Sequence, residues 1–199
     1  HTDASQAFQY LDCHVDALGV DLMTISAHKM CGPKGIGALY ARNPIHPIVT
    51  GGGQEAGLRS GTENVPAIVG FGKAVELVEG VRGIESKRVA ALRDHAWQGI
   101  KKIFPKAQRN SSSEVSLQNN LNFYMWGVSG EQILIALDLQ GIAISSGSAC
   151  TARYIDPSHV LLAMGYDKTR AKNSMRVTLG RRTTKAEIDA FLKALRDFS

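Results

Sequence analysis

A lysine and an aspartate in the first part of the chain could together bind a carbonyl cofactor. Lys29 follows the apolar run Leu22–Ser26 and directly precedes the glycine-rich residues 31–35. We expect this position to bury part of the Lys29 side chain, and burial lowers the pKa of an ammonium group. The neutral amine could form a Schiff base with the aldehyde of pyridoxal phosphate, while Asp3 pairs with the protonated ring nitrogen of that cofactor. The alternative is a surface lysine and a turn aspartate.

A glycine-rich segment, residues 51–62, could bind a phosphate group. It ends in Arg59-Ser60-Gly61-Thr62, just before a helix that we expect to begin at Asn64 and Pro66. Arginine, hydroxyl groups and a helix N-terminus all favour bound anions. The alternative is a long surface loop. Loops this rich in glycine, however, usually need glycine for their backbone conformation or for close approach to a ligand. The spacing of a Walker A motif is missing.

One cysteine in the second half of the chain has the surroundings of a nucleophile. Cys150 lies in the sequence SSGSACT at residues 145–151, which we expect to form an exposed loop between a strand and a helix. A structural cysteine would have apolar neighbours, whereas a mobile loop of serine and glycine can carry a thiolate between two sites. Cys13 and Cys31 lack this context, and we expect structural roles for both.

An arginine interrupts an apolar strand pattern near the end of the chain. Arg176 alternates with Met175, Val177 and Leu179. A guanidinium group matches the two oxygens of a carboxylate, so Arg176 could bind the α-carboxylate of a substrate. The alternative is a residue on the exposed face of a strand.

Composition limits the class of protein. The chain has 199 residues, of which 44% are hydrophobic and 21% charged, as is typical of a globular protein. No apolar run approaches the roughly 20 residues that span a bilayer. Basic residues are not interleaved with aromatic ones, as they are in grooves for single-stranded nucleic acid. We therefore expect no membrane and no nucleic acid among the partners.

The cysteine content and the charge indicate the cellular compartment and the kind of partner. The chain has 3 cysteines and no CxxC pair, which indicates reduced thiols in a cytoplasmic compartment and no metal site. The formal net charge is +5, and seven lysines and arginines without an acidic residue lie between Lys168 and Lys185. This run indicates either a solvated basic face or a docking surface for an acidic partner.

The periodicity of apolar residues predicts an α/β chain. Strands are expected over residues 22–26, 36–41, 119–125, 142–145 and 175–179. A pair of helices is expected over 64–78 and 89–103, and three more helices after Ser129, Asp156 and Thr184. We place a domain boundary inside the helix pair, near residue 80, which gives domains 1–80 and 81–199.

Taken together, the motifs resemble those of the group I cysteine desulfurases, the NifS/IscS-type enzymes, which are class V aminotransferase-like and use pyridoxal phosphate on fold-type I. The matching segments occur in the family's order along nearly the whole chain: HTDASQ at 1–6, SAHK at 26–29, GPKGIG at 32–37, residues 51–62, SSGSACT at 145–151 and RVTLGR at 176–181. The chain begins with His1 rather than Met, and the resemblance implies that it is roughly the C-terminal half of a longer enzyme.

The resemblance implies a fold and a role for each part. Residues 1–80 would be the C-terminal part of the large cofactor-binding domain, which has a mixed or parallel sheet. Residues 81–199 would be a small α/β domain that carries the catalytic cysteine loop. Because the N-terminal part of the family's fold is absent, we expect the chain alone to bind the cofactor weakly and to turn over little.

The resemblance also implies roles for individual residues. The catalytic residues would be Cys150, Lys29 and His28, and the substrate carboxylate would bind Arg176. The cofactor-binding residues would be Asp3, Gln6, Ser26, His28, Lys29 and Thr62. Among these, Gln6 would bond the phenolic oxygen of the cofactor, and Ser26 and His28 its phosphate. Thr62 would contact the phosphate bound by the neighbouring subunit, which implies a homodimer.

The implied reaction converts L-cysteine to L-alanine and leaves the sulfur on Cys150 as a persulfide. An iron–sulfur scaffold or another sulfur acceptor would then receive it. Gln54 stands where the family often has histidine, so no catalytic role is expected there. Alternatives are a selenocysteine lyase or other class V aminotransferase-like enzyme, a non-catalytic partner-binding fragment, and a thiol sulfur carrier that uses Cys150 alone.

Overall fold

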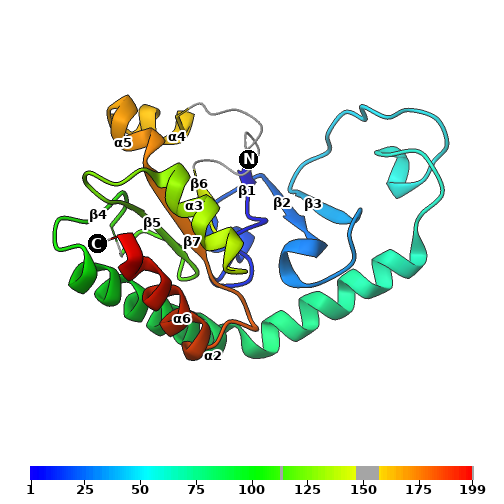
Figure 1. Cartoon of the computed structure of the whole chain (residues 1–199). Helices are drawn as coiled ribbons and strands as arrows, with labels where there is room; N and C mark the ends of the chain where they lie inside the picture. Colours follow the sequence, from blue (N-terminus) through cyan, green and yellow to red (C-terminus); the bar gives the residue numbers. More distant parts are fainter. Residues whose placement is uncertain (113, 147–156, 199) are drawn as a thin grey trace. The chain divides into compact units, whose positions relative to one another are not determined.

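The structure is a computed structural model that describes residues 1–112, 114–146 and 157–198. The chain divides into two compact units, His1–Ser86 and Lys87–Ser199. A mixed three-stranded sheet lies in the first unit and an antiparallel four-stranded sheet in the second, so the chain has the expected α/β class (Figure 1). Within the described ranges, no helix is long and apolar enough to cross a membrane.

The central strand of the first sheet is β2 (Leu22–Ser26). It pairs in parallel with β1 (Thr2–Asp3) and antiparallel with β3 (Gly37–Ala41). The short helices α1 (Val15–Leu18) and η1 (Ala27–Met30) lie in the two connections. The strands predicted over 22–26 and 36–41 are confirmed, whereas β1 and α1 are too short for periodicity to reveal.

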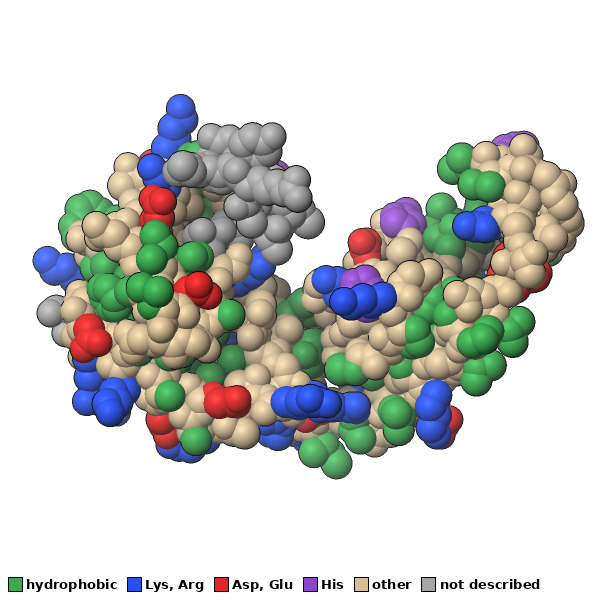
Figure 2. All heavy atoms as spheres, turned by 45° about the vertical axis from the view of Figure 1, so that its right-hand side comes forward, with side chains coloured by type: hydrophobic (Ala, Val, Ile, Leu, Met, Phe, Trp, Pro, Cys, Tyr) green, Lys and Arg blue, Asp and Glu red, His purple; other side chains and the backbone are tan. Residues whose placement is uncertain are grey.

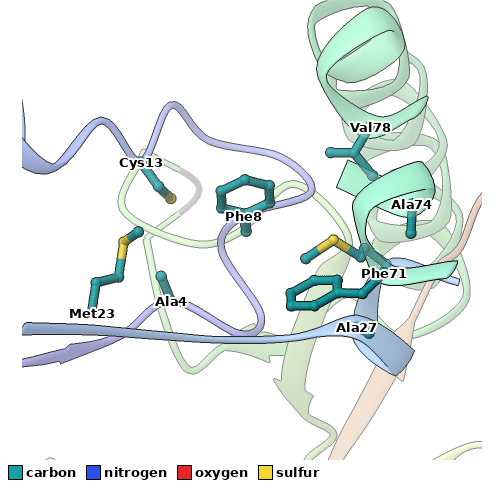
Figure 3. Close-up of a cluster of buried hydrophobic side chains, with 9 residues drawn as sticks. Ala4, Phe8, Cys13, Met23, Ala27, Phe71, Ala74 and Val78 are labelled. Atoms are coloured by element: carbon teal, nitrogen blue, oxygen red, sulfur yellow. The ribbon is translucent and has the colours of Figure 1, made fainter. Parts of the chain in front are cut away.

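The core of the first unit lies between this sheet and the first part of helix α2 (Val65–Ile103). Buried Phe8 and Met23 lie in one hydrophobic cluster with Phe71 and Val78 of α2 (Figure 3). Arg82 Nε also donates to the carbonyl oxygen of Phe8 at 3.1 Å. These contacts hold the segment that follows β1 against the helix.

Helix α2 is one continuous element, so the predicted pair of helices is wrong. It runs for 39 residues from Val65 to Ile103. No proline lies between Pro66 and Pro105, and a Cβ at Gly80 or Gly83 would meet no atom within 4 Å, so these glycines are in open surroundings inside the helix. Glycine lowers helix propensity by only about 1 kcal/mol, which the packing of the flanking turns can override.

The second unit is built on strands in the order β4-β5-β7-β6, all antiparallel. The bounds are β4 (Gln108–Arg109), β5 (Asn120–Tyr124), β6 (Ser145–Ser146) and β7 (Ser174–Thr178). Successive side chains of β5 and β7 point to opposite faces. One face buries Leu121, Phe123, Met175 and Val177, and the Phe123 ring lies 6.4 Å from that of Trp97 on α2. The other face is polar.

Four helices complete the second unit: α3 (Gly130–Leu139), α4 (His159–Ala163), α5 (Lys168–Lys172) and α6 (Lys185–Leu195). They are followed by the 3-10 turn η4 (Arg196–Phe198), whereas η2 (Glu55–Gly57) lies in the glycine-rich loop of the first unit. The caps predicted at Ser129 and Thr184 are confirmed, because each hydroxyl accepts a backbone N–H three residues later. Thr184 and Glu187 form a full capping box.

Three predictions in this unit need correction. The strand expected over 142–145 is β6, which begins only at Ser145. The helix expected to open at Asp156 and Pro157 begins at His159, because Ser158 caps it through its hydroxyl; Asp156 lies outside the described residues. Helix α5 was not predicted, since it has only five residues and too few turns to show a helical period.

The capping box gives a prediction about stability. Thr184→Ala should lower the free energy of unfolding by about 1 kcal/mol, because two backbone N–H groups at the start of α6 lose their side-chain acceptors or the geometry that supports them. Thermal unfolding checks this, with Thr169→Ala, an exposed threonine inside α5, as the matched control. Equal losses in the two variants would contradict the assigned cap.

Candidate functional site

Three polar side chains of the first unit meet where β1 and β2 end. Asp3 ends β1 opposite Thr24, and Ser26 ends the neighbouring β2. Ser5 connects them: its backbone N–H donates to Asp3 Oδ1 at 2.9 Å, and its Oγ lies 3.2 Å from Ser26 Oγ. The carboxyl ends of adjacent parallel strands are where open α/β sheets bind ligands.

The Asp3 carboxylate is held in its ionised form. The hydroxyl and the backbone N–H of Ser5 both bond it and lower the pKa of Asp3 below its ordinary value. The side chain is exposed, so burial opposes this only weakly. Asp3 therefore presents a fixed negative charge at neutral pH.

Lys29 lies on η1, directly after β2, but it is exposed, so the predicted burial of its side chain is wrong for the described structure. The turn directs Ala27 and Met30 into the core and leaves His28 and Lys29 outside. Gln9 Nε2 donates to the backbone carbonyl of Lys29, which ties the turn to the segment after β1. The sequence thus places the amine at the expected strand end, although its side chain faces outward.

The remaining predicted residues of the first unit are also exposed. Gln6 lies one residue after Ser5, and Thr62 is the last residue of the glycine-rich segment 51–62, which precedes α2. That loop is closed by internal bonds: Ser60 N donates to Val49 O at 3.1 Å, and Gly61 N donates to Gln54 Oε1 at 3.2 Å. Ser60 Oγ donates to Thr50 O at 2.9 Å, so the proton of this hydroxyl is already used in a hydrogen bond within the loop.

In the second unit, Arg176 lies on the polar face of the sheet, in the middle of β7. It pairs with Asn122 of β5 on one side and with Ser145 of β6 on the other. Its Nε is buried and has no hydrogen-bond partner among the residues that the structure describes. An unpaired buried N–H is unfavourable unless something accepts from it, so this arginine is suited to an incoming anion.

The predicted nucleophile, Cys150, lies outside the described residues, which omit 147–156. The strand that precedes this segment is described as far as Ser146. Of the other two cysteines, Cys13 is buried as expected. Cys31, for which a structural role was also expected, is exposed: it is the left-handed residue that ends η1, with φ 63°.

The basic run between Lys168 and Lys185 is not simply a solvated face. The Arg170 guanidinium stacks 4.0 Å from the centre of the Tyr166 ring. Its Nε donates to Oδ1 of buried Asn110 at 2.8 Å. Sequence reasoning missed the contact between Arg170 and Asn110, because partners 60 residues apart in the chain leave no spacing signal. Asn122 did leave one, as it alternates with apolar Leu121 and Phe123 in a strand.

Comparison with known proteins places the chain in a family. The family model described as aminotransferase class-V matches residues 1–191. The chain belongs to the class-V aminotransferase family. A protein named cysteine desulfurase IscS from Dictyoglomus turgidum is 45% identical over 197 residues, which are 98% of this chain and 50% of that protein. Another of the same name from Clostridium botulinum is 43% identical over 199 residues, with 98% and 50% covered.

Solved structures of class-V aminotransferase relatives have the same fold. A NifS-like protein superposes with a TM-score of 0.87 at 36% identity, covering 98% of this chain and 50% of that one. The X-ray structure of a NifS-like protein from Rickettsia africae gives 0.87 at 34% identity, covering 99% and 52%. The expected resemblance and fold class are confirmed. The chain spans about half the length of the curated relatives it matches.

The hydrogen bonds at Asp3 give a prediction about pH. Ser5→Ala should raise the pKa of Asp3, but not fully to its ordinary value, because the backbone N–H of residue 5 still donates. A lowered folded pKa stabilises the fold above the unfolded pKa, and this stabilisation is lost as pH falls through the folded pKa. The variant should therefore lose less stability than the wild type on acidification.

The carboxyl carbon resonance of Asp3, followed against pH by NMR, measures this shift. Ser26→Ala is the matched control, since Ser26 contacts the Ser5 hydroxyl but not Asp3 itself. If Ser5→Ala leaves the titration of Asp3 unchanged, Ser5 does not hold the carboxylate.

Proposed function

We propose that the whole protein to which this chain corresponds is a pyridoxal phosphate-dependent cysteine desulfurase. The observation that carries the proposal is the ionised Asp3, bonded by Ser5 beside the end of β2, where the chain continues directly into Lys29. A fixed carboxylate and a lysine amine at neighbouring strand ends are what a pyridine-aldehyde cofactor requires. Relatives named cysteine desulfurase, 43–45% identical, support the activity.

The residues of the first unit fit this cofactor chemically. Asp3 can accept from a protonated ring nitrogen, and the depressed pKa of its carboxyl keeps it ionised for that purpose. Ser26 and His28 offer donors for phosphate oxygens, Gln6 an amide for the phenolic oxygen, and Lys29 an exposed amine for the aldehyde. Thr62 would serve the phosphate of the neighbouring subunit. When bound, pyridoxal phosphate supplies an electron-withdrawing ring that stabilises negative charge on the substrate α-carbon.

Lys29 has a second task as a base and acid. With L-cysteine bound, Lys29 Nζ would accept the proton from the substrate α-carbon and later return a proton. Arg176 would hold the substrate carboxylate meanwhile, because its guanidinium is charged and its Nε–H has no partner in the described part of the chain. His28, next to Lys29 on η1, would be a further catalytic residue at the same strand end.

Cys150 takes the sulfur. Its thiolate attacks the sulfur atom of L-cysteine, so that an S–S bond forms while the bond between that sulfur and Cβ breaks. The electron pair of the broken bond goes to Cβ, which gains a proton, and the products are L-alanine and a persulfide on Cys150. The reaction needs no external oxidant or reductant, because the sulfur moves as a neutral atom between two thiols. A sulfur-acceptor protein, such as an iron–sulfur scaffold, would then take it.

We also propose a homodimer, with the domains 1–80 and 81–199, in the cytoplasm. Large hydrophobic side chains of the first unit reach its surface (Figure 2), among them Val65, Val69 and Ile84 of α2, of which Val69 is 66% exposed. Exposed apolar patches of this kind mark contact surfaces. Two compact units support the two domains, and the free thiols of Cys13 and Cys31 fit a reducing compartment.

Cofactor binding by the chain can be tested directly. Excess pyridoxal phosphate should give the visible absorbance band of a lysine-bound cofactor, and Lys29→Ala should lack it, because Lys29 is the proposed amine that binds the aldehyde. Lys34→Ala, an exposed lysine five residues away, is the matched control and should keep the band. A band that survives in Lys29→Ala would sink the assignment.

The role of Cys150 can be tested in the whole protein. Cys150→Ala should reduce L-alanine formation from L-cysteine at least about a thousandfold, since the nucleophile is lost. Cys31→Ala, which removes an exposed thiol from the first unit, should leave the rate within about twofold of wild type. Quantifying L-alanine by chromatography measures both. Normal turnover in Cys150→Ala would exclude the persulfide step.

A further inference from the structure

Asn110, Asn122 and Arg176 lie in one row across the polar face of the second sheet, which Ser145 of β6 continues beyond Arg176. Asn122 on β5 and Arg176 on β7 are direct partners in the antiparallel pair. Asn110 lies just beyond β4 and donates its backbone N–H to Asn122 O at 3.0 Å, which continues the β4–β5 pairing by one residue. Directly opposed residues on antiparallel strands project to the same face, with Cβ atoms about 4.5–5.5 Å apart. The side chains of Asn122 and Arg176 are therefore neighbours.

The orientation of the Asn110 amide is fixed by its partners. Arg170 Nε lies 2.8 Å from Asn110 Oδ1, and a guanidinium can only donate, so the amide atom facing it must be the oxygen. The other end, Nδ2, donates to Ser174 Oγ at 2.7 Å. The Ser174 hydroxyl gives its own proton to the carbonyl oxygen of Arg170 at 2.7 Å, so it must accept from Asn110. Both contacts require the same orientation.

The orientation of the Asn110 amide also fixes that of the Asn122 amide. Asn110 Nδ2 also lies 2.6 Å from Asn122 Oδ1. Because Asn110 presents a donor there, Asn122 must present its oxygen, and its Nδ2 is left over. Asn122 Nδ2 donates to none of the described residues, so this amide offers two free N–H groups on the face that it shares with Arg176.

Arg170 can impose this order because it is itself held on several sides. Its Nη1 donates to Gln108 Oε1 at 2.7 Å and its Nη2 to the carbonyl oxygen of Arg109 at 3.0 Å. Its guanidinium stacks on Tyr166, whose hydroxyl donates to the carbonyl oxygen of Asn110 at 2.8 Å. A planar guanidinium held in this way loses little further freedom when it orients a neighbour.

We propose that Asn122 is a second binding residue for the substrate carboxylate, beside Arg176. This inference rests on the proposed function, which supplies an amino acid as the substrate. Among the described residues, the Nδ2 of Asn122 and the buried Nε of Arg176 are adjacent donors without a partner on this face, where the buried Asn120 Oδ1 also has none. Such a pair is favourable when an anion accepts from both. Asn122 thus adds a neutral donor that fixes the direction of the carboxylate, and Arg170 and Asn110 are positioning residues.

Binding of L-alanine, the product of the proposed reaction, tests the inference on the chain itself. In proton–nitrogen NMR spectra, L-alanine should shift the side-chain N–H signals of both Asn122 and Arg176. L-Alaninamide, which lacks the carboxylate, should shift neither. Asn122→Asp, nearly the same in shape but unable to donate, should weaken L-alanine binding by about tenfold or more. Gln132→Glu, an exposed position on α3 with the same charge change, is the matched control and should bind normally.

A second variant changes a residue that orients Asn122 but does not touch the ligand. In Asn110→Asp, residue 110 can still accept from Arg170 but can no longer donate to Asn122, so the Asn122 amide should turn and present its oxygen to the carboxylate. L-Alanine binding should again fall by about tenfold, although residue 110 does not touch the ligand. Well-dispersed spectra of both variants confirm that they fold.

The outcomes separate this inference from the proposed function. If L-alanine shifts Arg176 alone and Asn122→Asp binds normally, the role of Asn122 is overturned and the proposed function stands. If neither residue responds in the wild type, the carboxylate site on this face is overturned, and the proposed function is then judged by the Lys29 absorbance band. Weakened binding in both Asp variants, with a normal control, supports the inference.

Discussion

The register between β5 and β7 is the constraint on which the second unit depends. It places Leu121 and Phe123 opposite Val177 and Met175 on the buried face, and Asn122 opposite Arg176 on the other. Because side chains alternate with a period of two, a slip by one residue would exchange the two faces. It would bury a guanidinium in an apolar core and expose the core to water. The same pairing that forms the core therefore places the arginine.

The first unit follows a similar logic with a parallel pair of strands. The pairing of β1 with β2 brings Asp3 next to the end of the strand that leads to Lys29, although the two residues are far apart along the chain. Ser5 then fixes the carboxylate and connects it to Ser26 through the two hydroxyls. The candidate site residues of the first unit thus lie at strand ends, where backbone geometry is set by the sheet and side chains remain accessible. The hydrophobic cluster that contains Phe8 and Phe71 packs against this part of the first sheet.

The sequence alone revealed the features that depend on neighbouring residues. Strands 22–26 and 36–41, the caps at Ser129 and Thr184, and the motif context of Lys29 and Arg176 all follow from local patterns. It failed where distant contacts or chain length decide. The continuity of α2 depends on packing that outweighs Gly80 and Gly83, and the two-residue strand β1 exists only because β2 lies beside it. The Arg170–Asn110 contact joins residues 60 positions apart, and a basic run gave no sign of it. The outward direction of Lys29 depends on the phase of one short turn, η1.

The proposed reaction depends on transfer of the sulfur of L-cysteine to Cys150. The most direct measurement is a single turnover of the whole protein with pyridoxal phosphate and L-cysteine that is radiolabelled at sulfur, followed by digestion without reductant. If Cys150 accepts the sulfur, the peptide that contains Cys150 carries the label, a thiol reductant releases it, and one L-alanine forms for each labelled sulfur. Free labelled sulfide with pyruvate in place of L-alanine, and no label on that peptide, would contradict it.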